Sequence, residues 1–268
     1  MAFQHSLVVI KNYFTATEEC IDNYRFCLKS IKELLAHCVF DPYLAYELAN
    51  YVDPAISPAY EEEIYAILPI IGRDKHTSLI LYKDSWLVVE LAPIEIVKEI
   101  LMRFNQLKYE PYIEAIQSFF EKKIRRVPVA TNRYSLMPIG GKNDKQTIWI
   151  NAGRVSEIIS NPFNSTVILD NHFKLAVERV EMRIYELMRR GFISHGVIKR
   201  DFSNLATRPT TFLFNFLNIS STEVTRKVLK EISYNDLPGK YLDFRNRYNQ
   251  SYDNYQRKIF LKELDIEA

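Results

Sequence analysis

The sequence predicts an α+β protein in which a mixed, β-rich central domain lies between helical N-terminal and C-terminal segments. Short apolar runs flank polar turns in the middle of the chain, which is typical of β-hairpins. Apolar residues recur at three- and four-residue steps near both ends, which favours helices. Only 7 of 268 residues are glycine, and this argues against a barrel with many tight turns. We expect a helical extension over 1–55, a central domain over 56–200 and a helical region over 201–268.

The N-terminal segment has helical periodicity over residues 15–51, with Thr15 or Thr17 as a cap and a second short helix over 42–51. Three cysteines, Cys20, Cys27 and Cys38, recur roughly along one face of this helix. Their spacing is too wide for a typical metal site, which favours free thiols in a reducing compartment. Two prolines in residues 52–58 disfavour helix, and we place a domain boundary there.

In the central domain, segments with a strand-like pattern alternate with segments that have a helix-like pattern. Its last helix is expected to end at Gly191, because glycine commonly terminates helices. Gly140-Gly141-Lys142 lacks the spacing of a phosphate-binding loop and predicts a turn. The expected strands are 64–71, 78–82, 86–91, 125–130, 134–138, 147–150, 166–170 and 173–177, and the expected helices are 93–104, 112–123 and 177–192.

The C-terminal region contains one helix with a recognisable cap. Thr222 precedes Glu223 and an apolar set at helical spacing, which is typical of a capped helix start. A turn at Pro238-Gly239 follows, and the chain ends in an amphipathic piece rich in tyrosine and arginine.

Net charge is distributed unevenly. The whole chain carries +2, but residues 119–200 hold fifteen basic and seven acidic side chains, a net +8. Such a segment within a nearly neutral chain indicates a polyanion-binding surface. The alternative is a solvated basic face paired with the acidic N-terminal half. Residues 1–10 lack the features of a signal peptide, and no apolar stretch is long enough to span a membrane. We therefore expect a cytoplasmic protein.

The basic side chains gather in two runs and at several expected turns. Phosphate neutralisation requires many cations on one surface, and arginine can read the shape of a narrow A·T-rich minor groove. The predicted DNA-binding residues are Lys122, Lys123, Arg125, Arg126, Arg133, Lys142, Lys145, Arg154, Arg179, Arg183 and Arg190.

No motif indicates an enzyme, a metal site or a cofactor. Asp170 and His172 lie close in sequence, but no serine or cysteine has the surroundings of a catalytic nucleophile. We expect no catalytic residues, no metal and no cofactor. Two further hypotheses remain: a protein–protein regulator whose basic segment is only surface charge, and a hydrolase that rests on Asp170 and His172 alone.

Four pieces, in order, resemble the competence transcription factor (ComK) family of low-GC Gram-positive bacteria. Tyr60-Glu61 is followed by Ala66-Ile67-Leu68-Pro69, and the run from Lys122 to Arg126 is followed by Val127-Pro128-Val129. Trp149-Ile150 and the basic segment from Tyr185 to Arg190 come later. The resemblance covers about residues 59–195.

The resemblance implies a transcription activator that binds A·T-rich DNA boxes from the minor groove, as dimers that pair on one promoter. It also implies activation of DNA-uptake genes and restraint by an adaptor–protease system. This chain departs from the family in its added residues 1–55. At the place of the family's adaptor-binding motif it has Phe212-Leu213-Phe214-Asn215 without the expected proline.

Overall fold

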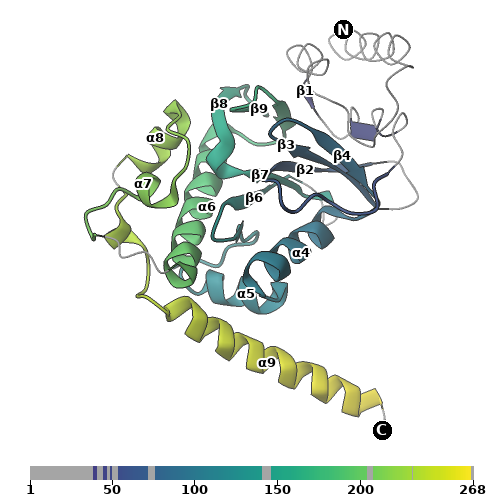
Figure 1. Ribbon diagram of the computed structural model, residues 1–268, viewed down its shortest axis with the longest axis vertical. Helices are drawn as coiled ribbons and strands as arrows, with labels where there is room; N and C mark the ends of the chain where they lie inside the picture. The colour runs from purple at the N-terminus through teal and green to yellow at the C-terminus, as the bar shows by residue number, and fades with distance from the viewer. Residues whose placement is uncertain are drawn as a thin grey trace.

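A six-stranded antiparallel sheet forms the centre of the molecule in the computed structural model (Figure 1). The structure describes residues 39–40, 45–46, 49, 54–71, 76–140, 146–203, 208–230 and 232–266, with side chains to 263. Every neighbouring pair of strands in this sheet is antiparallel. In spatial order the strands are β4 (Trp86–Val89), β3 (Thr77–Tyr82), β2 (Ile64–Ile70), β7 (Ile148–Asn151), β6 (Ser135–Ile139) and β5 (Val129–Ala130).

A second, four-stranded sheet packs on one face of the first. Its antiparallel hairpin of β8 and β9 continues into β10, and the short β1 pairs with β10 in parallel. In spatial order the strands are β1 (Val39–Phe40), β10 (Lys174–Val177), β9 (Ser165–Leu169) and β8 (Val155–Ser160).

Helices complete the fold and confirm the α+β class. Pro93 opens α4 at a position where its missing N–H costs nothing, and the Glu95 carboxylate accepts a hydrogen bond from the backbone N–H of Ala92 at 2.6 Å. Thr222 caps α8 as expected, since its hydroxyl accepts from the Thr225 N–H at 3.1 Å. Among the described residues, the helices with assigned bounds are α4 (Pro93–Asn105), α5 (Tyr109–Gln117), α6 (Glu181–Phe202), α7 (Leu213–Leu217), α8 (Glu223–Leu229) and α9 (Asp243–Ile266), with short 3₁₀ turns η3 (Ala152–Arg154) and η4 (Tyr234–Asp236).

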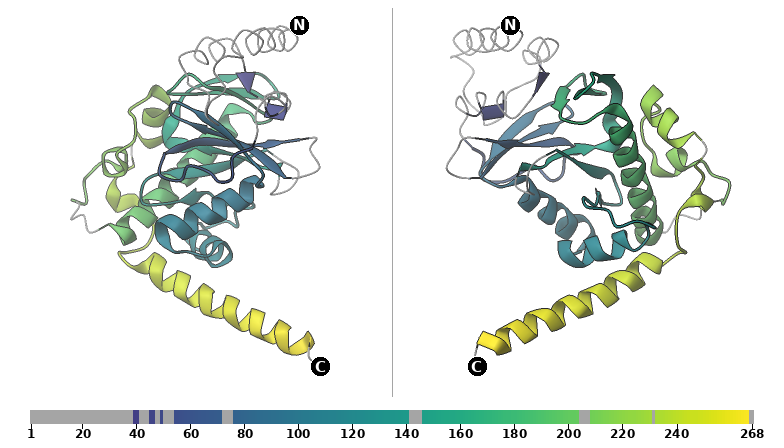
Figure 2. Two further views of the ribbon diagram at one scale, coloured as in Figure 1. Left: turned by 45° about the vertical axis from the view of Figure 1, so that its right-hand side comes forward. Right: turned by 180° about the vertical axis from the view of Figure 1, so that it is seen from behind.

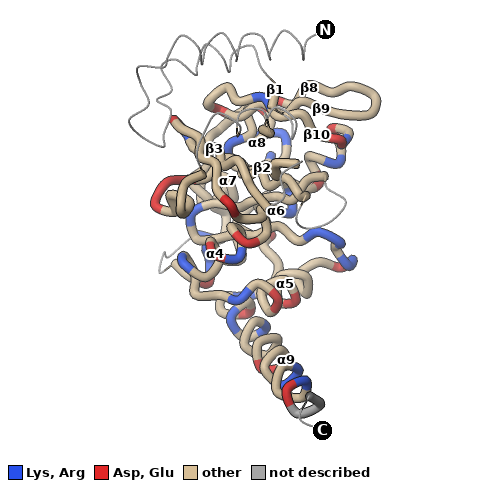
Figure 3. The backbone as a smooth tube through the Cα atoms, turned by 90° about the vertical axis from the view of Figure 1, so that its right-hand side faces the viewer, with Lys and Arg blue, Asp and Glu red and all other residues tan. Residues whose placement is uncertain are grey.

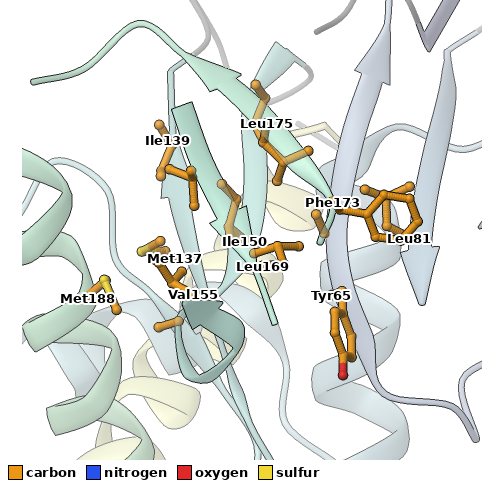
Figure 4. Packing of buried hydrophobic residues seen from close by; sticks show 14 of the residues in the cluster. Tyr65, Leu81, Met137, Ile139, Ile150, Val155, Leu169, Phe173, Leu175 and Met188 are labelled. Atoms are coloured by element: carbon orange, nitrogen blue, oxygen red, sulfur yellow. The ribbon is translucent and has the colours of Figure 1, made fainter. Parts of the chain in front are cut away.

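Two hydrophobic cores lie on opposite faces of the six-stranded sheet. One core joins this sheet to the four-stranded sheet and to the first half of α6, where Met188 points toward Met137 (Figure 4). The other core joins the opposite face to α4, α5 and Phe244 of α9. Side chains alternate between the two cores along the central strands, as the two-residue period of a strand requires, except at an irregularity in β2 where Tyr65 and Ala66 face the same core.

The C-terminal helix α9 packs along α5 as far as Lys258, which pairs with Glu114 at 3.8 Å, and its end projects from the body of the molecule (Figures 1 and 2). Its tyrosines continue the contact, because the Tyr248 hydroxyl accepts a hydrogen bond from the Lys108 N–H at 2.9 Å. Near its end, Phe260 and Leu261 are exposed.

Several predictions about elements were wrong. Only Val129–Ala130 of the expected strand 125–130 is a strand, and α5 begins and ends earlier than predicted. The strand β8 was not predicted. Gly191 lies inside α6 and does not end it. A Cβ atom at this position would lie 3.3 Å from Ser135 Oγ and 3.4 Å from Ala152 Cβ, so glycine there permits close packing of the helix on the sheet.

Most of the predicted N-terminal extension lies outside the described residues, including the three cysteines and the expected helix start. Val39 and Phe40, inside the helix predicted over 15–51, form a strand instead. Pairing with Lys174 and Leu175 outweighs the local helical pattern there. The domain boundaries expected near residues 55 and 200 stay predictions.

Candidate nucleic-acid interface

Six of the predicted DNA-binding residues line one groove of about 330 Å³. One side of the groove is formed by α6 and by the residues just before this helix in the chain. The other side is formed by the segment that follows α5. Pro138 of β6 and Leu187 of α6 add apolar lining. The cations of the groove, called the basic groove below, are Lys123, Arg125, Arg126, Arg179, Arg183 and Arg190.

The α6 side of the basic groove owes its shape to helical spacing. Arg183 and Arg190 lie seven residues apart, two turns along one face. Glu186 lies between them and forms ion pairs with both, the pair with Arg190 at 3.9 Å. The Arg183 side chain is 63% exposed, so this pair contributes little to stability and leaves the guanidinium accessible to a ligand.

The opposite side is an irregular segment held by one buried residue. Ile124 is buried, and its carbonyl accepts a hydrogen bond from Gln117 Nε2 at 2.9 Å. Its neighbours Lys123 and Arg125 are exposed. In Figure 3 the chain after α5 carries several Lys and Arg positions in succession. An apolar anchor between cations therefore presents the charges to solvent.

Arg126 differs from its neighbours because its guanidinium donates to the carbonyl of Gly140. It is only partly exposed, and it ties the basic segment to the end of β6. We therefore assign Arg126 a role in positioning the segment as well as a charge in the basic groove.

The electrostatic character of the basic groove is strongly positive. Its lining holds six cations and a single carboxylate, that of Glu186. Like charges concentrated in a concave surface raise the local concentration of anions. Five of the six cations are arginines, whose planar guanidinium presents five donors to phosphate oxygens.

The remaining predicted residues lie elsewhere. Lys122 is exposed beside the basic groove. Lys142 and Lys145 lie outside the described residues. Arg133 and Arg154 line a different pocket, described below. The guanidinium of Arg154 binds the Glu63 carboxylate through Nε at 3.0 Å and through Nη2, and it contacts Asp170 Oδ2 at 3.2 Å.

These two carboxylates neutralise Arg154, and hydrogen bonding to Glu63 raises its pKa. The placement of Arg154 among DNA-binding residues therefore has no geometric support. Asp170 serves this ion-pair network and also accepts from Ser220 Oγ at 3.3 Å. His172 occupies the β9–β10 turn with φ of 73°.

One exposed aromatic residue near the basic groove was not predicted. Phe163 is 88% exposed in the loop between β8 and β9. The turn end of this hairpin is tied to the basic groove, because Ser165 Oγ donates to the carbonyl of Arg179 at 2.7 Å. The sequence signal was Asn161-Pro162-Phe163-Asn164, a turn-rich quartet with an apolar residue where polar residues are usual.

In a comparison with known proteins, no family model, no curated protein and no solved structure matches this chain. None of the helices in the described ranges combines the length and apolar character that a membrane span needs. Among the same residues, no group of three His, Cys, Asp or Glu side chains could hold a metal ion.

Proposed function

We propose that this protein binds double-stranded DNA through the basic groove and acts as a transcription activator at A·T-rich promoter boxes, as the ComK family does. The observation that carries the proposal is the convergence of two basic segments, separated by more than fifty residues, on one groove with six cations and one carboxylate. Because like charges repel at short range, bringing six cations together costs energy. Surface charge with no ligand to bind would not require the cations to converge.

The arginine content of the basic groove supports a contact with the minor groove. Arginine inserts into narrow A·T-rich minor grooves, where the negative potential is strongest. Phe163 supports the same geometry, since minor-groove proteins often insert an apolar side chain between base steps. A hydrogen bond from Ser165 to the carbonyl of Arg179 connects the hairpin that bears Phe163 to the segment before α6.

The decisive experiment is fluorescence-anisotropy binding to an A·T-box duplex and to a G·C-rich duplex of equal length, across a salt series. We expect preference for the A·T duplex and a logarithmic salt slope of about −0.9 for each phosphate neutralised. The double variant Arg125→Glu with Arg183→Glu should lower affinity at least about tenfold and flatten the slope by about two.

A matched control makes the same change in net charge, two cations replaced by two glutamates, outside the basic groove. Lys230 lies at the end of α8 and Arg257 lies on α9, and both are exposed. The variant Lys230→Glu with Arg257→Glu should bind DNA like the unmodified protein. Equal, weak binding to both duplexes, or equal losses in the two double variants, would contradict the proposal. It would favour the protein–protein regulator, in which the basic segment is only surface charge.

Dimer formation and adaptor-mediated proteolysis belong to the same proposal. Of the four residues at the family's adaptor position, Phe212 is exposed by 53% whereas Leu213 is buried. An adaptor could therefore contact Phe212 without unfolding α7. Sedimentation with and without a two-box duplex measures the dimer, and degradation assays with Phe212→Ala measure the adaptor contact.

A further inference from the structure

A second pocket, of about 320 Å³, lies beside the C-terminal half of α6. It is called the α6 pocket below. Residues from five places in the chain meet in it: Glu63 before β2, Ser135 at the start of β6, Gly153 of η3, His195 and Lys199 of α6, and Asn218 after α7. Its volume suits a small metabolite, since ligand pockets begin at roughly 300 Å³.

Three residues that line the α6 pocket each have a buried polar atom without a hydrogen-bond partner: His195 Nε2, Ser135 Oγ and Tyr134 Oη. His195 and Ser135 are each only 1% exposed. Unsatisfied buried polar groups are destabilising, and they are rare in folded proteins unless a ligand or water completes them. All three residues line the α6 pocket, so a bound molecule can supply the missing partners.

The protonation state of His195 defines what such a molecule must offer. The backbone of Asn132 hydrogen-bonds to the imidazole, and burial together with the charge of Lys199 lowers the pKa of His195 to about 3. The imidazole is therefore neutral near pH 7. Because Nε2 is the unpartnered nitrogen, the Asn132 bond uses Nδ1, and Nε2 is left as an acceptor. A ligand must present an O–H or N–H donor to it.

The charged side chains favour an anion at the other end. Lys199 Nζ donates to the carbonyl of Leu217 at 3.1 Å and has further N–H donors. Burial lowers the pKa of Lys199, and a nearby anion would oppose this effect. Arg133 also lines the α6 pocket. The carboxylate of Glu63 does not cancel these charges, because it is bound by Arg154.

We propose that the α6 pocket binds a small hydroxylated organic anion. Its carboxylate or phosphate lies toward Lys199 and Arg133, and its hydroxyl donates to His195 Nε2 and contacts Ser135. This site is independent of the proposed DNA contact, because it shares no residue with the basic groove.

The test compares pairs of anions that differ by their hydroxyl groups, by isothermal titration calorimetry at fixed ionic strength. Citrate and tricarballylate form the carboxylate pair, and glycerol 3-phosphate and propyl phosphate form the phosphate pair. We expect the hydroxylated member of one pair to bind at least tenfold more tightly than its partner. Which pair discriminates identifies the anionic group.

Two variants locate the binding. Ser135→Ala and Lys199→Gln each change a polar group without adding volume, and each should weaken the preferred anion at least tenfold. The basic-groove variant Arg125→Glu with Arg183→Glu should retain full binding, since those residues lie outside the α6 pocket. An imidazole nitrogen spectrum should show the Nε2 resonance of His195 shifting on addition of the anion.

Three results would overturn the proposal. One is equal affinity within both pairs, or no binding of any of the four anions. Another is loss of binding in the basic-groove variant while Ser135→Ala and Lys199→Gln bind normally. The third is an His195 Nε2 resonance that does not move at saturating anion.

Discussion

The carboxylate of Asp201 accepts a hydrogen bond from the backbone N–H of Phe244, 43 residues later, at 3.0 Å. The same carboxylate accepts from the N–H groups of Leu242 at 3.0 Å and Arg245 at 3.3 Å. These groups belong to the start of α9, whose first N–H groups have no partner within the helix. A residue near the end of α6 thus caps α9 from a distant part of the chain.

Removal of this cap should loosen α9. Asp201→Ala leaves three backbone N–H groups without their acceptor and removes the carboxylate beside the buried Arg200, which keeps its bonds to the carbonyls of Pro238 and Gly239. We expect a loss of about 2–3 kcal/mol in the free energy of unfolding. Urea denaturation measures the loss, and hydrogen exchange shows whether α9 opens first. Asp253→Ala, on an exposed position of α9, is the control. Equal denaturation midpoints for the two variants would show that the cap is unimportant.

Gly239 adopts a conformation that other residues avoid. Its φ is +73°, and a Cβ atom there would lie 2.5 Å from Cε1 of Phe119. Gly239→Ala should therefore cost about 2 kcal/mol or more, from backbone strain and the clash with Phe119. Gly140→Ala is the matched control, because φ there is +66° but nothing lies within 4 Å of the added atom. A smaller loss at 239 than at 140 in thermal unfolding would refute this reasoning.

Arg154 should affect stability and not DNA binding. Arg154→Met leaves Glu63 and Asp170 without their shared cation, and we expect a loss of about 2–4 kcal/mol in the free energy of unfolding. Arg183→Met should have the opposite profile: unchanged stability and weaker, less salt-dependent DNA binding. Denaturation and anisotropy on both variants check this. A normal melting temperature for Arg154→Met would argue against the ion-pair network.

His195 should make the fold sensitive to acid. Its pKa falls from 6.5 to about 3 on folding, so between these values the unfolded chain binds more protons and stability decreases as pH falls. Between pH 7 and pH 5 the contribution is about 2 kcal/mol. Protonation is opposed by burial and by the charge of Lys199, and the carboxylate of Glu63 in the same pocket is bound by Arg154.

The variant His195→Gln isolates this contribution from that of the carboxylates. Its free energy of unfolding, measured in urea at pH 7 and pH 5, should fall about 2 kcal/mol less than that of the unmodified protein. The same pH dependence in both proteins would show that His195 does not titrate as proposed.

Phe163 should act on DNA shape more than on protein stability. Because its side chain is 88% exposed, Phe163→Ser should leave the melting temperature unchanged. If the hairpin inserts this ring between base steps, the variant should bend an A·T-box duplex less, which end-to-end fluorescence energy transfer measures. Ile159→Ser, also exposed on the β8 strand, is the control. Identical bending by all three proteins would place the hairpin away from DNA.

Local pattern was enough to predict much of the fold. The hairpin of β3 and β4 was confirmed because alternation and the polar turn at Lys83-Asp84-Ser85 are properties of neighbouring residues. The helix α4 was confirmed for the same reason. Predictions failed where long-range contacts outweighed local preference, as at Gly191, which looks like a helix end but packs against Ser135 inside α6.

By itself, the sequence determined the α+β class and the concentration of positive charge in residues 119–200, since both depend on residue type and short spacing. Only the tertiary structure decided which cations meet. Packing of α6 against the edge of the six-stranded sheet brings Arg183 and Arg190 to Lys123 and Arg125, while Glu63 and Asp170 enclose Arg154. The physical reason is that charge is carried by single residues, whereas a binding surface depends on distances between segments that only the packed core sets.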